Sequence, residues 1–172
     1  NQIYDAFKVY AGTNKVASAG ISALVADIHE YANYYCSMAL GHETDKKLAE
    51  AFADLREFKV EVVYPFLLEL YHDYTNGQLS PEDFESVLRL VESYVFRRAV
   101  CNIATNSLNK TFANMTKGLD KEKYLESIQA HFLLLPSYRR FPKNEEFQRE
   151  IRVRDLYSFP RRSYWLRRVE NF

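Results

Sequence analysis

Residues that break helices or cross-link chains are scarce in this sequence. Its 172 residues include five glycines, five prolines and two cysteines. With so few breakers, the chain favours helices over a succession of short strands. Cys36 and Cys101 both stand inside apolar helical patterns, which argues against a disulfide framework and is typical of a reducing compartment. No apolar run approaches the roughly 20 residues of a membrane-spanning helix, so we expect a cytoplasmic protein with no membrane partner.

Several catalytic motifs are missing as well. The segment HEYAN at 29–33 begins like the helix of a zinc protease, but Asn33 stands where the second histidine is needed. No cysteine pair has zinc spacing, and there is no glycine-rich phosphate loop and no G-x-S-x-G motif. No arginine precedes a histidine by four to six residues, the spacing of some helical ribonucleases. We therefore predict that this chain has no catalytic residues, no metal site and no cofactor, while the activity of the complete protein stays open.

The apolar residues that are present recur at helical spacing. In the segment 14–40 they follow the i, i+3, i+4, i+7 pattern of one helix face, and Gly41 then ends the helix. Further helices are predicted over 2–11, about 45–58, 64–74, 80–103, 105–117 and 120–135, and from about 144 and 160 onward. These segments predict one all-α domain over residues 1–172, an irregular bundle of about eight helices.

Capping residues mark where several of these helices begin. Ser80 is followed by Pro81 and Asp83, a strong start signal, and Thr105 and Asp120 are the predicted caps of the next two helices. The segment 58–63 alternates like a strand, but Pro65 follows it and a single strand would have nothing to pair with. We therefore predict a helix break there.

Charge is unevenly distributed along the chain. The total is zero, yet residues 1–138 carry 13 Lys/Arg against 18 Asp/Glu, and residues 139–172 carry 10 against 5. A mildly acidic helical body is therefore followed by basic C-terminal helices. Such asymmetry indicates a partner for the basic third, and DNA is one candidate.

Two adjacent arginines interrupt the apolar pattern of the helix predicted over 80–103. On a helical wheel, Arg98 falls on the apolar stripe beside Val91 and Val95, whereas Arg97 points away from it. A guanidinium on a core face must find a carboxylate or several carbonyl groups, because burying it unpaired costs several kcal/mol. We predict that Arg98 is a buried structural charge, with a contact to a ligand phosphate or DNA as the alternative.

The last predicted helix combines apolar and basic residues. Trp165, Leu166 and Val169 share a face that should pack on the body, and its edge is lined by Arg161, Tyr164 and Arg168. One interpretation is a solvated basic surface, or a contact with an acidic partner domain; the other is an edge that follows a DNA backbone through bidentate phosphate contacts. The candidate DNA contacts are Arg139, Arg140, Arg152, Arg154, Arg161 and Arg168.

An ordered set of segments carries a family resemblance over nearly the whole chain. The segments are IYDAFKVY, VVYPFLLEL, VLRLVESYVFRRAVCNIATNSLNKTF, RRFPKNEEFQREI and SYWLRRVEN. In this order they resemble the helical region of GmrSD-type, modification-dependent (type IV) restriction endonucleases and their phage-defence relatives. In that family the region lies between a ParB-like nucleotide-hydrolysing domain and an HNH-type nuclease domain.

The resemblance implies a connecting role in a bacterial enzyme. The nucleotide and nuclease motifs of the family have no counterpart here, so no catalytic residue carries over. Both ends of the sequence lie in amphipathic patterns, and we expect a fragment whose partners are the flanking domains of a longer protein. One rival interpretation is a protein-interaction module with no role in DNA binding. Another is an enzyme with a pocket converging on Arg98, His72 or His131.

Overall fold

The protein is all-helical. The computed structural model describes residues 2–155, 157–159 and 162–170, apart from the side chains of 14–19 and 169. The α-helices are α1 (Gln2–Ala11), α2 (Asn14–Leu40), α3 (Lys46–Phe58), α4 (Tyr64–Thr75), α5 (Pro81–Val100), α6 (Leu108–Phe112), α7 (Tyr124–Leu133), α8 (Asn144–Val153) and α9 (Arg162–Glu170). Short 3-10 helices, η1 (Glu61–Val63), η2 (Thr105–Ser107) and η3 (Ser137–Arg139), join some of them. The described part contains no strand, which confirms the predicted all-α class. None of its helices has the combination of length and apolar character that crossing a membrane requires.

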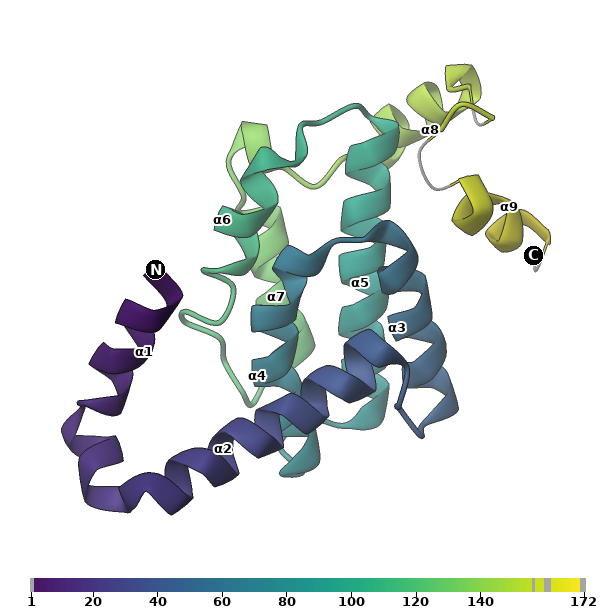
Figure 1. Ribbon diagram of the computed structural model, residues 1–172. Helices are drawn as coiled ribbons and strands as arrows, with labels where there is room; N and C mark the ends of the chain where they lie inside the picture. The colour runs from purple at the N-terminus through teal and green to yellow at the C-terminus, as the bar shows by residue number, and fades with distance from the viewer. Residues whose placement is uncertain (1, 156, 160–161, 171–172) are drawn as a thin grey trace.

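The central helix is α5, and its sequence explains both its start and its position. Ser80 accepts the backbone N–H of Asp83 at 3.1 Å, and Pro81 occupies the first turn, where its missing N–H costs nothing. Helices α3, α4, α7 and α8 all pack against α5 (Figure 1). The apolar stripe that faces them is fully buried: Phe84, Val87, Leu88, Val91 and Val95.

The predicted break after α3 is present. Asp45 caps α3 by accepting two first-turn backbone N–H groups at 2.9 and 3.0 Å. The helix ends at Lys59, whose left-handed φ of 52° turns the chain. The 3-10 turn at 61–63 then leads into α4, where Pro65 lies in the first turn. The alternating pattern of 58–63 is therefore a helix-to-helix connection, as the proline indicates.

The prediction for the end of α5 and the following cap is wrong in detail. The helix ends at Val100 rather than near residue 103, and Asn102 adopts a left-handed φ of 53°. Thr105 makes no capping hydrogen bond and belongs to η2 instead. Arg98 donates to the carbonyl of Ala104 at 2.6 Å, and this side-chain contact ties the loop to the end of α5.

The next two helices are shorter than the sequence predicts. Helix α6 ends at Phe112 rather than near residue 117, and the Asn114 side chain donates to the Lys110 carbonyl at 2.8 Å. A side chain that takes a helical carbonyl in this way competes with continuation of the helix. Asp120 accepts a backbone N–H two residues on, within a turn, and α7 begins only at Tyr124.

Helix α1 and the first half of α2 form an arm beside the body. Gly20 has φ 84° and ψ 167°, values that only glycine adopts easily, and they kink α2. Beyond the kink, α2 passes along α4, where Tyr34 and Met38 are buried, and ends at Gly41 with a φ of 80°. We call residues 2–28 the arm. In Figure 1 the arm lies on one side of the body and α9 on the other.

Candidate functional site

Arg98 is a buried cation held by neutral oxygens. Its side chain is only 1% exposed. The guanidinium donates to the carbonyl of Ala104 at 2.6 Å, to Oγ of Ser107 at 3.0 Å and to the carbonyl of Tyr138 at 3.3 Å. Burial lowers the pKa of Arg98, and its Nε has no hydrogen-bond partner among the described residues. The prediction of a buried Arg98 is confirmed, with carbonyl groups rather than a carboxylate as its partners.

Arg97 makes more contacts than its position on the helical wheel indicates. It is half-buried and donates to Oδ1 of Asn144 at 2.6 Å and to the carbonyl of Pro142 at 3.2 Å. Its guanidinium carbon lies 5.0 Å from the ring centroid of Phe147. Helix α8 packs over this side of α5, so Arg97 joins the two helices instead of facing solvent. A wheel for one helix does not contain this information.

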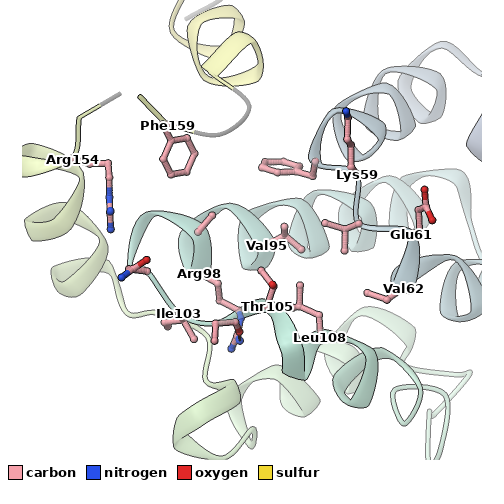
Figure 2. A pocket seen from close by; sticks show the side chains of 15 residues that line it. Lys59, Glu61, Val62, Val95, Arg98, Ile103, Thr105, Leu108, Arg154 and Phe159 are labelled. Carbon is pink, nitrogen blue, oxygen red and sulfur yellow. Dashed lines mark hydrogen bonds between the residues drawn. The ribbon is translucent and has the colours of Figure 1, made fainter. Parts of the chain in front are cut away.

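A cavity of about 680 Å³ lies beside Arg98. Figure 2 shows Arg154 and Phe159 on one side of this space, and Lys59 and Glu61 on the other. The α3–α4 connection, α5 and the loop that follows α5 line it. Its volume lies within the range of small-molecule sites.

Two buried carboxylates face the C-terminal helix. Asp54 of α3 and Glu92 of α5 are 2% and 3% exposed, and we call them the acidic pair. Arg89 of α5 bridges them, at 2.5 Å to Asp54 and 2.8 Å to Glu92. From α9, Arg167 lies 2.5 Å from Asp54 and Arg168 lies 2.8 Å from Glu92. Helix α9 is therefore bound to the body by charge pairs whose carboxylates are buried and whose arginines remain partly exposed.

Tyr164 completes this contact. Its hydroxyl donates to Glu92, and its ring centroid lies 4.3 Å from that of Phe58. Burial first, and then the bond to Glu92, raises the pKa of Tyr164 above its ordinary value of 10.0. Although burial alone would lower the pKa of Arg168, its bonds to Tyr164 and Glu92 outweigh that effect and raise it.

The face by which α9 packs differs from the predicted one. Trp165 stacks on Phe96 with ring centroids 5.1 Å apart, as expected of an apolar face, but Leu166 is 49% exposed. The side chain of Val169 lies outside the described residues. Tyr164, predicted on the edge of the helix, is buried. The acidic pair explains this rotation, because Asp54 and Glu92 need cations and the helix turns its arginines towards them.

The predicted DNA contacts of the basic third have partners within the chain in several cases. Arg168 pairs with Glu92, as described above. Arg140 forms an ion pair with Glu146. Arg154 donates to the carbonyl of Val100, at the end of α5.

The remaining candidates differ in exposure. Arg139 is half-buried, with its guanidinium carbon 5.3 Å from the ring centroid of Tyr138. Arg152 is exposed and makes no hydrogen bond or ion pair within the described part of the chain. Arg161 lies outside the described residues. DNA contact by these six arginines stays a prediction. Arg152 is the exposed candidate with no hydrogen bond or ion pair among the described residues, and the half-buried Arg139 side chain forms none either.

The histidines that an enzyme site would use do not converge on Arg98. His72 stacks on Tyr31 with ring centroids 5.6 Å apart, and its Nδ1 lies 3.8 Å from Glu30. Burial, and after it the charge of Arg139, lowers the pKa of His131. Neither histidine lines the cavity beside Arg98.

The arm presents apolar side chains to solvent. None of the ten residues of α1 is buried. Val9 and Ile21 are 74% and 80% exposed. Other large apolar residues of the arm are also exposed: Tyr4, Phe7, Tyr10, Val25 and Ile28. An interaction surface is the usual reason for a group of this kind.

Comparison of the chain with protein-family models, with curated proteins and with solved structures finds no match. The acidic pair is the feature that analysis of the sequence missed. A signal for it exists, because Glu92 lies four residues after Leu88 and three before Val95, on the same stripe that identifies Arg98. A carboxylate on an apolar stripe must find a cation, as Glu92 does in Arg89 and Arg168.

Proposed function

We propose that this chain is a helical connector that holds a neighbouring domain or polypeptide against its arm. The observation that carries this proposal is the exposure of apolar side chains on α1 and the first half of α2, beside a body whose own apolar stripe is buried. Tyr4, Phe7, Val25 and Ile28 make such a surface costly in water, and a partner helix would cover it. The general role is thus protein–protein contact.

The larger assembly that we propose is a GmrSD-like restriction endonuclease. The order of the sequence segments supports this part of the proposal. In such an assembly the connector would set the distance between a nucleotide-hydrolysing domain and a nuclease domain. The rival is an interaction module of another assembly, and the arm surface serves that role equally well.

Site-specific photo-crosslinking in cells that make the protein natively tests the proposal. A photoreactive phenylalanine analogue replaces Phe7 in the arm, or Tyr138 as the control, which is 58% exposed outside the arm. We expect the position of Phe7 to form a discrete cross-link with a nucleotide-hydrolysing or nuclease domain, and Tyr138 to form none. A cross-link to a protein of another class would contradict the endonuclease assembly and favour the rival interaction module. Equal cross-linking from the positions of Phe7 and Tyr138 would contradict the proposal that the arm holds the partner.

DNA-backbone contact by the basic third is the finer part of the proposal. Arg152 supports it, because this exposed cation is available to a phosphate. Arg152→Ala should weaken binding of the complete protein to duplexes of any sequence and should lower the log–log salt slope by about 0.9, the value for one phosphate. Glu145→Ala, which removes an exposed anion from the same helix, is the control for a general change in charge. An unchanged slope in Arg152→Ala would exclude this contact.

A further inference from the structure

The cavity beside Arg98 has a wall that is mainly apolar. Phe58 approaches it from the end of α3 and Val60 from the α3–α4 connection. Val95 approaches from α5, and Ile103 and Phe159 from later segments. Water in such a space gains few hydrogen bonds, so an apolar group that displaces it is favoured. The wall therefore suits the hydrocarbon part of a small molecule.

Two cationic residues of the cavity have no carboxylate partner among the described residues. Arg98 and Arg154 both line it, and neither forms an ion pair with a carboxylate within the described residues. Each keeps a buried Nε–H without a hydrogen-bond partner. Glu61 is the cavity's carboxylate; it is exposed and lies across the space from Arg154 (Figure 2). Arg98 is buried and Arg154 is half-buried, and a buried cation is costly unless a nearby anion balances its charge.

The contrast with the acidic pair strengthens this point. Where α9 meets the body, the arginines that turn inwards meet Asp54 and Glu92. At the cavity, Arg98 and Arg154 meet only carbonyl and hydroxyl oxygens. Neutral oxygens accept hydrogen bonds from some of the guanidinium N–H groups, but they do not balance the positive charge.

We propose that this cavity binds an amphipathic organic carboxylate, with its hydrocarbon part between Phe58 and Phe159 and its carboxylate on the side of Arg154. The apolar wall selects the body of the ligand, and the positive charges of Arg154 and of the buried Arg98 select its charge. A carboxylate accepts hydrogen bonds from the planar fork of an arginine more readily than a neutral alcohol does. This site is independent of the arm and of the proposed connector role.

Isothermal titration of the full chain with n-octanoate and n-octanol, which have the same chain length, tests the proposal. We expect octanoate to bind with a Kd about tenfold lower than that of octanol, since a hydrogen bond to a charged group contributes about 1.4 kcal/mol or more. Inorganic phosphate alone should not compete. Equal affinities for octanoate and octanol, no binding of octanoate, or full competition by phosphate would each overturn the proposal.

Two variants on one helix locate the contact. Arg154→Gln keeps a hydrogen-bond donor but removes the charge. It should raise the Kd of octanoate about tenfold and leave the Kd of octanol unchanged. Arg152→Gln removes an exposed charge two residues away and should change neither Kd by more than about twofold, as expected for a distant site. Equal losses in both variants would show a general effect of charge and overturn the site.

Two substitutions within α5 extend the test. Ala99→Leu adds bulk to the cavity wall and should weaken the binding of octanoate and of octanol to a similar extent. Arg98→Met should weaken octanoate selectively, provided that circular dichroism shows a folded protein. Should Arg98→Met fail to fold, Arg154→Gln and Ala99→Leu still decide the question. Unchanged binding in both of these would refute the proposal.

Discussion

The arm and α9 are opposite cases of a terminal helix. The arm is rich in apolar side chains, yet Val9 and Ile21 remain exposed. Helix α9 carries several arginines, yet it is bound firmly against α3 and α5 through Asp54 and Glu92. Composition alone would have placed the arm inside and α9 outside. The difference shows that a helix packs where its side chains find complementary partners, whatever its mean hydropathy.

Removing one anion from the acidic pair should produce the largest effect, by breaking the attachment of α9. Asp54→Ala leaves Arg89 and Arg167 without their shared carboxylate, and we expect unfolding free energy to fall by about 3–5 kcal/mol. Glu50→Ala, an exposed carboxylate on the same helix, should cost less than about 0.5 kcal/mol. Urea denaturation of both variants measures the difference. Similar midpoints for the two would show that Asp54 adds little to the attachment and that Glu92 and the apolar contacts hold α9.

Arg98 tests whether neutral partners hold a buried cation as firmly as the acidic pair holds its arginines. Arg98→Ala removes the bonds to Ala104 and Ser107, and we expect a loss of about 2–4 kcal/mol. Arg97→Ala should cost about 1 kcal/mol, because it loses contacts that are only half-buried. Thermal melts compare the two. Equal shifts would contradict the assignment of Arg98 to the core.

Alkaline pH should weaken the attachment of α9 through Tyr164. Its pKa is raised in the folded state, so the folded protein keeps the phenol proton while the unfolded chain loses it above its ordinary pKa of 10.0. The stabilisation is complete below pH 10 and declines as pH rises above it. Tyr164→Phe should cost about 1.5 kcal/mol at pH 7, and the gap between variant and wild type should narrow above pH 10. A constant gap would exclude a titrating Tyr164–Glu92 bond.

The smallest effect on stability should come from the arm. Phe7→Glu combined with Tyr10→Glu alters two exposed rings of α1, and we expect unfolding free energy to change by less than about 0.5 kcal/mol. The same double variant should abolish the cross-link from the arm when the photoreactive group is moved to the position of Tyr4. A large loss of stability would show that the arm packs on the body in solution. Retention of the cross-link would place the partner elsewhere.

Local signals in the sequence determined much of the fold. Ser80 with Pro81, Asp45 and Gly41 mark helix ends through backbone hydrogen bonds and φ angles that depend on adjacent residues alone. Periodic apolar spacing likewise determined that the chain is all-helical, because the pattern reflects the geometry of one helix. The burial of Arg98 also follows from its place on such a stripe.

Tertiary structure decided what the basic residues do. Arg98 donates to the carbonyl of Tyr138, forty residues further along the chain. Leu166 faces solvent because Asp54, more than a hundred residues away, attracts Arg167. The net charge of a segment is a sum over its residues, but the partner of each charge depends on which distant helices meet. Local sequence therefore specified the helices, and only their packing determined which charges are paired inside the protein and which have no carboxylate partner among the described residues.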